Sequence, residues 1–221
     1  MPRLPRGQIH GYVYHVINRG NDRATVFYQE EDYSGFLDLL AAAKTRHPVK
    51  LFGFCLLSNH FHIVLEPASM SALSRFMHWW LTSHVQQHRR HHGGSGHIWQ
   101  ARFKSFPIQQ DAHFLMVLRY VLLNPVRAGL VTHPEQWPWS SLHFAHLLDP
   151  WPVPMPLPGK EWLEEPLLEH DLVMLRTSVN RQAPFGAPPW QRRVAHDLNR
   201  ESTLLPRGRP KLPSENRNVP F

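Results

Sequence analysis

The chain has 221 residues, 42% of them hydrophobic, which suffices for one domain with a core plus appendages. Its one cysteine, Cys55, excludes an internal disulfide and any zinc site built from several thiolates. No apolar run approaches membrane-spanning length, so we expect a soluble, cytoplasmic protein. A net charge of +7 and a pI near 10.0 favour a polyanionic partner, most often nucleic acid, over simple solubility.

The distribution of charge strengthens this expectation. No Asp or Glu occurs from Pro67 to Gln110, a stretch that contains six histidines and the basic residues Arg75, Arg89, Arg90, Arg102 and Lys104. The C-terminal end is also basic, with Arg192, Arg193, Arg200, Arg207, Arg209 and Lys211. Such one-sided stretches are typical of surfaces that face phosphates.

The N-terminal half alternates between strand and helix patterns. Side-chain alternation predicts a strand over His10–Ile17, followed by a polar loop over 19–23. Acidic residues at the start and basic residues at the end predict a helix over Glu30–His47. Apolar runs over 51–57 and 60–65 flank Ser58-Asn59 and indicate a hairpin or two neighbouring strands.

The next segment continues the alternation. We expect a helix from Ser71 to about His92, stopped by Gly93-Gly94, and then one or two strands within 98–108. Asp111 should cap a third helix that runs to about Leu123 and ends because of Pro125. This order predicts an α+β fold, an antiparallel sheet covered by helices.

The character of the chain changes after Asp149. We therefore expect a folded domain over 1–149 and a proline-rich linker over 150–160. An accessory helical segment should follow over 161–183, and then a basic, partly disordered tail over 184–221.

Two histidines lie two residues apart in the second strand of the expected hairpin. Side chains at this spacing share one face of a strand, so His60 and His62 can bind one metal ion while Phe61 and Ile63 fill the core behind them. A chain with 17 histidines will contain such a pair by chance. The position inside an apolar strand is the better evidence, because a buried histidine needs a polar partner.

Tyr120 and Asn124 lie one helical turn apart on the third helix, and Tyr120 lies off its main apolar stripe. Such a tyrosine is more often a core residue than a nucleophile. An amide beside two imidazoles could complete a site for Mg²⁺ or Mn²⁺. Ionising an ordinary phenol near pH 7 costs about 4 kcal/mol, which a Lewis acid at the phosphate can offset.

Several long motifs then make the chain recognisable. His60-Phe61-His62 resembles the paired-histidine motif of HUH nucleases, and the run over 120–131 resembles the single-tyrosine segment of REP-associated tyrosine transposases. Further matches lie at 15–21, 98–105, 137–141 and 201–210. The resemblance covers nearly the whole chain except the proline-rich linker.

The resemblance implies a ferredoxin-like catalytic domain that cleaves single-stranded DNA at REP-like palindromic hairpins. Tyr120 would be the nucleophile and would form a 5′-phosphotyrosine, with His60, His62 and Asn124 as ligands of a divalent metal, Mg²⁺ or Mn²⁺. Members of the family are single-copy bacterial enzymes whose active site is formed within one chain. The resemblance therefore implies a monomer, and we expect it to associate with the nucleoid.

We expect the following basic residues to contact DNA: Arg19, Arg23, Arg102, Lys104, Arg127, Arg207, Arg209 and Lys211. Each could instead belong to a solvated basic face. Two alternatives to the nuclease stay open. The same fold could hold DNA hairpins without cutting them, or the histidines could belong to a metallohydrolase unrelated to DNA, against which the acid-free stretch argues.

Overall fold

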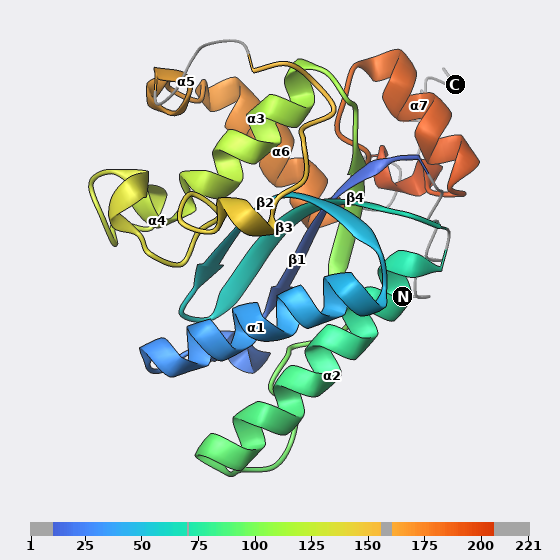
Figure 1. The fold of residues 1–221 in the computed structure, drawn as a ribbon. Helices are drawn as coiled ribbons and strands as arrows, with labels where there is room; N and C mark the ends of the chain where they lie inside the picture. Colours follow the sequence, from blue (N-terminus) through green and yellow to red (C-terminus); the bar gives the residue numbers. More distant parts are fainter. Residues whose placement is uncertain (1–10, 70, 156–160, 206–221) are drawn as a thin grey trace, which may run out of the picture.

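A computed structural model describes residues 11–69, 71–155 and 161–205 of the chain (Figure 1). Its strands are β1 (Val13–Arg19), β2 (Val49–Leu57), β3 (His60–Pro67) and β4 (Lys104–Ile108). Its helices are α1 (Glu30–Arg46), α2 (Ala72–His92), α3 (Ala112–Leu122), α4 (Asn124–Arg127), α5 (Glu161–Glu164), α6 (Glu169–Arg181) and α7 (Pro188–Asp197). Short 3₁₀ helices are η1 (Asn21–Arg23), η2 (Pro134–Gln136), η3 (Ala145–Leu147) and η4 (Glu201–Thr203).

The four strands form one antiparallel sheet in the order β2-β3-β1-β4. Helices α1 and α2 cover one face, and α3 and α6 cover the other (Figure 1). The chain order β1-α1-β2-β3-α2-β4 with this strand order is the ferredoxin-like arrangement, so the expected α+β fold is confirmed. Strands β2 and β3 form the predicted hairpin about Ser58 and Asn59.

Two apolar cores lie on the two faces of the sheet, because successive strand residues point to opposite sides. The core beneath α1 and α2 contains Phe36, Phe61 and Trp80, and the Trp80 indole donates a hydrogen bond to the Phe36 carbonyl at 3.0 Å. The core beneath α3 and α6 contains Val64, Phe106, Phe114 and Leu175. Phe61 and Ile63 therefore lie behind the histidine face, as the sequence predicted.

A glycine lets α3 lie close to the sheet. Gly53 is at a register irregularity in β2, and a Cβ there would lie 2.3 Å from Leu118 Cδ1 on α3. A larger residue would require the Leu118 side chain to move, so Gly53 makes the close packing of Leu118 on the sheet possible.

The segment after α4 returns along the free edge of β2. Leu56 N–H donates to the Trp139 carbonyl at 2.9 Å, and Ser141 N–H donates to the Phe54 carbonyl at 2.9 Å. A salt bridge of 2.6 Å between Lys44 and Asp149 fastens the end of this segment to α1. The Trp137–Ser141 motif therefore covers an edge that would otherwise expose unpaired backbone groups.

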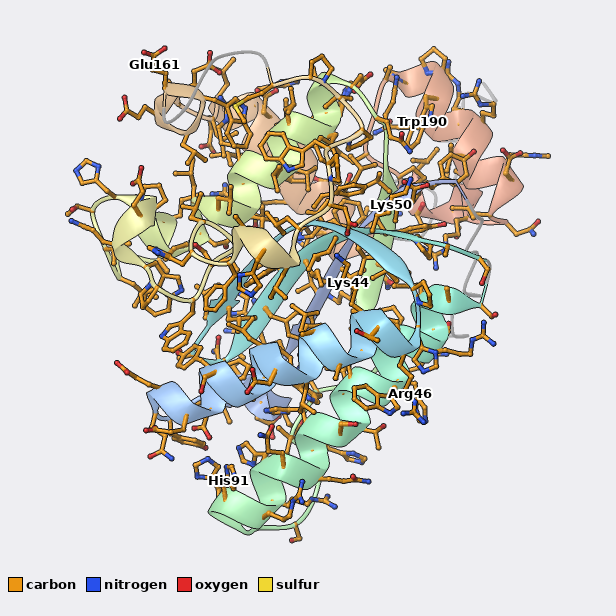
Figure 2. All side chains as sticks on the ribbon, in the orientation of Figure 1. Lys44, Arg46, Lys50, His91, Glu161 and Trp190 are labelled. Atoms are coloured by element: carbon orange, nitrogen blue, oxygen red, sulfur yellow. The ribbon has the colours of Figure 1, made fainter. Side chains whose placement is uncertain are left out.

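The C-terminal region is more regular than the sequence suggested. The structure has a helix, α7, within the stretch expected to be partly disordered, and Val194 and Ala195 on it are fully buried. Trp190 lies on the side of α7 that faces the sheet (Figure 2), and its ring meets Tyr12 edge-on at 5.9 Å. Burial of these apolar side chains stabilises residues 185–205, although the composition of this segment is mostly polar. The proposed domain boundaries stay a prediction.

The stretch 98–108 contains one strand, Lys104–Ile108, in agreement with the one or two predicted, and Gln100 to Arg102 before it are exposed. The helix that begins after Asp111 ends near Leu123, as predicted, and a short helix follows it. Helix α3 ends at Leu122, and Pro125 occupies the first turn of α4, where its missing N–H costs nothing. The predicted cap is confirmed, since the Asp111 side chain accepts from His113 N–H at 2.8 Å.

Within the described ranges, no helix combines the length and apolar character needed to cross a lipid bilayer.

A buried histidine on α2 makes the fold sensitive to acid. His84 is 2% exposed and packs against the rings of Phe27, Phe36 and Trp99. Burial, and then the charge of His88, lowers the pKa of His84 from 6.5 to about 3. Between these values the unfolded chain binds the proton and the folded chain does not, so stability falls as the pH falls.

We expect His84→Phe to flatten this pH dependence. Below about pH 6, the free energy of unfolding of this variant should fall less steeply with decreasing pH than that of the parent chain. The two slopes should differ by up to about 1.4 kcal/mol per pH unit. Urea unfolding at a series of pH values measures the slope. His78→Phe, at an exposed position on the same helix, is the matched control. An unchanged slope in His84→Phe would show that the prediction is wrong.

Candidate active site and nucleic-acid surface

The paired histidines project from β3 toward α3. In the register of the sheet, His60 lies opposite Arg19 and His62 lies opposite Ile17 of β1. His62 is 4% exposed, whereas His60 is half-buried at the end of the strand. The two rings lie 5.1 Å apart between centroids, so the predicted common face is confirmed.

A third histidine supports the pair from β1. His15 Nε2 lies 2.9 Å from His62 Nδ1, and the two rings stack at 5.1 Å. His15 is fully buried, and burial lowers its pKa to about 3, so its imidazole is neutral. In the tautomer where His62 Nδ1–H donates to His15, the lone pair of His62 Nε2 is left for a ligand.

His60 has a matching support from the hairpin turn. Its Nδ1 lies 2.7 Å from Asn59 Oδ1, which can only accept, so Nδ1 carries the proton and Nε2 carries the lone pair. Burial, and then the charge of Arg19, lowers the pKa of His60 to about 4. Burial and the neighbouring cationic groups hold the pKa of His62 well below 6.5. Both imidazoles are therefore neutral at neutral pH.

The phenol of Tyr120 lies on the same side of the sheet. Its ring centroid is 5.8 Å from that of His62 and 6.2 Å from that of His15. Tyr120 is only 7% exposed and belongs to the core beneath α3, so the expectation that it lies off the apolar stripe was wrong. The face of α3 that is buried against the sheet is therefore wider than the apolar stripe in its sequence, and it includes Tyr120.

Asn124 and Arg127 lie on α4, directly after the helix that carries Tyr120. Asn124 Nδ2 donates to the Tyr120 carbonyl at 2.8 Å, a bond that fixes the amide and turns its Oδ1 away from that carbonyl. The Arg127 guanidinium lies over the Tyr120 ring at 4.4 Å, a cation–π arrangement at the exposed end of the helix.

The donor set suits a divalent cation. His60 and His62 each use Nδ1 in a hydrogen bond and keep Nε2 for a metal, the arrangement that orients histidine ligands in metal sites. Among the described residues no three His, Cys, Asp or Glu side chains converge as a metal site. The Asn124 amide is hydrogen-bonded to the Tyr120 carbonyl rather than to either histidine, so its place in a metal site stays a prediction.

The predicted DNA-contacting residues fall into three groups. Arg19 and Arg127 lie beside the histidines and the tyrosine. Arg23 lies on η1, and Arg102 and Lys104 lie at the β4 edge of the sheet, all three exposed. Arg207, Arg209 and Lys211 lie outside the described residues.

Sequence reasoning did not assign a role to His15, although it lies inside an apolar strand as His62 does. The signal was available, because a histidine in such a run requires a polar partner. What could not be read from sequence was the pairing of β1 with β3, which brings the two rings together.

Comparison with known families agrees with this geometry. The family model described as "Transposase IS200 like" matches residues 8–124, just over half of the chain, and the match includes His15, His60, His62, Tyr120 and Asn124. The chain belongs to this family of IS200-like transposases.

Two curated relatives match more weakly. A Haemophilus influenzae protein with the provisional name of REP-associated tyrosine transposase is 28% identical over 108 residues, 44% of this chain and 61% of the relative. The chain thus matches less than two thirds of that protein's length. The REP-associated tyrosine transposase of Escherichia coli K12 is 23% identical over 135 residues, 60% of this chain and 77% of the relative.

A solved structure shares the fold. The structure of a REP-associated tyrosine transposase bound to a REP hairpin aligns with a TM-score of 0.53 and 21% identity, covering 76% of this chain and 100% of that one. This supports the family assignment at the level of the fold.

The histidine contact makes a spectroscopic prediction. We expect His62 to carry its proton on Nδ1 and to donate it to His15 Nε2 at 2.9 Å, because only this tautomer leaves His62 Nε2 free for a ligand. Long-range ¹H–¹⁵N NMR distinguishes the two tautomers directly. His15→Phe removes the acceptor and should let His62 shift toward the Nε2–H form, whereas His15→Gln can still accept. A His62 ring protonated on Nε2 in the parent protein would contradict the assignment.

Proposed function

We propose that this protein is a site-specific, metal-dependent endonuclease and strand transferase that acts on single-stranded DNA at palindromic, REP-like hairpins. The observation that carries the proposal is the meeting of Tyr120 with His62, ring to ring at 5.8 Å, in one chain of the IS200-like family. The relatives' names and the hairpin-bound structure support the substrate class.

His60 Nε2, His62 Nε2 and Asn124 Oδ1 would hold the cation, Mg²⁺ or Mn²⁺. Bound there, it would supply Lewis-acid activation of the scissile phosphate. His15 and Asn59 would be positioning residues. Asn59 Oδ1 accepts from His60 Nδ1–H, and His15 Nε2 would accept from His62 Nδ1–H, which would leave both metal-facing Nε2 atoms free of protons.

Tyr120 would attack phosphorus through its phenolic oxygen. The bond from phosphorus to the 3′ oxygen breaks, a 5′-phosphotyrosine forms, and the DNA keeps a free 3′-hydroxyl. The phenolic proton leaves to water, and the departing 3′ oxygen takes one up. Because the phosphodiester energy is retained in the tyrosyl linkage, a second 3′-hydroxyl can reverse the step and join strands.

The basic residues would bind the substrate. Arg19 and Arg127 lie nearest the tyrosine and are suited to the scissile phosphate and its neighbours. Arg23, Arg102 and Lys104 would contact the DNA farther along the strand. Arg207, Arg209 and Lys211 would add contacts from the C-terminal end. With nucleophile and metal ligands in one chain, a monomer can act alone.

The decisive test is a covalent adduct. Incubation of the protein with a labelled hairpin oligonucleotide that has single-stranded flanks, in Mn²⁺, should yield a protein–DNA species that survives denaturation. Tyr120→Phe lacks the attacking oxygen and should yield none, while Tyr28→Phe, at an exposed tyrosine, keeps it.

Two other results would change the interpretation. Hairpin binding without any adduct in the parent protein would favour a non-cleaving hairpin-binding protein on the same fold. An adduct that persists in Tyr120→Phe would assign the nucleophile to another residue.

The amide ligand has its own test. We expect Asn124→Ala to weaken Mn²⁺ binding measured by calorimetry without DNA, because it removes the only hard ligand of the set. Asn124→Gln, which restores an amide on a longer arm, should recover part of the affinity. Gln86→Ala, on the exposed side of α2, controls for general effects. Equal Mn²⁺ affinity in Asn124→Ala and the parent would remove Asn124 from the site.

A further inference from the structure

Residues 20–27, which follow β1 and contain η1, form a loop (the η1 loop) that wraps around the turn of the β2–β3 hairpin. Gly20 N–H donates to the Asn59 carbonyl at 2.7 Å. Phe27 N–H donates to the Ser58 carbonyl at 3.0 Å. The η1 loop therefore lies directly against the turn that precedes the paired histidines.

The side chain of Asn59 connects the η1 loop to the first of these histidines. Its Nδ2 donates to the Arg23 carbonyl at 2.9 Å, and its Oδ1 lies 2.7 Å from His60 Nδ1. Because a backbone carbonyl can only accept, the contact with Arg23 determines which end of the amide faces His60. That end is the oxygen, which requires the proton of His60 on Nδ1 and leaves Nε2 free for a ligand.

The opposite orientation of this amide would have the opposite effect on His60. Without the Arg23 carbonyl as acceptor, the Asn59 amide can rotate so that Nδ2 faces the ring. An amide NH₂ group donates, so His60 then accepts on Nδ1 and carries its proton on Nε2. A nitrogen that carries a proton cannot bind a metal ion. Rotation of one amide therefore closes the ligand position at His60 while the fold stays the same.

The backbone of the η1 loop is suited to move the Arg23 carbonyl. Arg23 has φ +62° and Asp22 has φ +50°, in the left-handed region that residues other than glycine seldom adopt. The side chain of Arg23 is exposed, and so is its hydrogen bond with Asn59, where water can compete. The position of this carbonyl thus depends on whatever holds the loop, and a phosphate bound to the guanidinium is one such contact.

We propose that the η1 loop controls metal binding: the Arg23 carbonyl, through the Asn59 amide, sets the tautomer of His60 and so decides whether Nε2 can take a cation. The inference rests on the proposed function for the role of His60 as a metal ligand. A DNA strand bound at the Arg23 side chain holds the loop in place and keeps the ligand position open. Arg23 is then a positioning residue as well as a DNA contact.

A matched pair of variants tests the role of the loop. Arg23→Pro and Arg23→Gly both remove the guanidinium, but proline fixes φ at about −65° and excludes the left-handed conformation, which glycine favours. Long-range ¹H–¹⁵N NMR, without metal or DNA, should find His60 protonated on Nδ1 in the parent and in Arg23→Gly. The Nε2–H form should appear in Arg23→Pro. Calorimetry should find Mn²⁺ binding about tenfold weaker in Arg23→Pro than in Arg23→Gly.

A second substitution separates this route from general damage to the loop. In Asn59→Asp, the carboxylate accepts at either oxygen and so requires His60 Nδ1–H wherever the loop lies. The double variant Arg23→Pro with Asn59→Asp should therefore return His60 to the Nδ1–H form. Asn59→Asp alone shows what the added charge does to Mn²⁺ affinity.

Thermal melting checks that each variant is folded. If Arg23→Pro does not fold, Arg23→Val takes its place, because a β-branched residue disfavours positive φ without fixing the backbone.

The outcomes separate this inference from the proposed function. The same His60 tautomer and Mn²⁺ affinity in Arg23→Pro and Arg23→Gly would overturn it, whether or not Tyr120 forms an adduct with DNA. A tautomer change that Asn59→Asp does not reverse would also overturn it, because the route would not run through Asn59. A change that Asn59→Asp reverses would support it even if the parent protein forms no covalent adduct.

Discussion

Antiparallel pairing of β1 with β3 determines which side chains meet beneath α3, because residues opposite each other in a sheet share a face. This pairing brings His15 to His62 and Arg19 to His60. A slip of one residue would turn both histidines of β3 into the core beneath α1 and α2. Phe61 prevents the slip, since its ring is enclosed by Phe36, Trp80 and Trp99 on that other face.

The electrostatic character of the site follows from this arrangement. Burial and the nearby guanidinium groups keep His60 and His62 neutral. Two neutral imidazoles and a neutral amide would leave the full charge of a divalent cation to act on phosphate, whereas carboxylate ligands would cancel part of it. Arg19 and Arg127 add positive charge at the border of the site. The site therefore favours a phosphodiester over a neutral substrate.

The sequence predicted the parts of the site that depend on local periodicity. The common face of His60 and His62 follows from the strand repeat, and the neighbourhood of Tyr120 and Asn124 follows from the helical turn. That Tyr120 lies beside His62 was expected only from the family resemblance, since nothing local specifies which face of the sheet α3 covers. The role of His15 was missed for the same reason. The helix α7 was missed because its buried residues are few and lie among arginines and prolines.

The burial of Tyr120 constrains how it could react. Its helix is held by Phe114, Val117 and Leu118, all fully buried, and by the close approach of Leu118 to Gly53. Helix α3 therefore cannot lift from the sheet without opening a core, which would cost several kcal/mol. Movement toward a phosphate must come from rotation of the phenol about its own side-chain bonds and from displacement of the Arg127 guanidinium above it. A substrate phosphate is the natural competitor for that guanidinium, because a charge-assisted hydrogen bond is stronger than an exposed cation–π contact. Under the proposed function, DNA binding would therefore also expose the Tyr120 phenol, which would stay covered until a strand is in place.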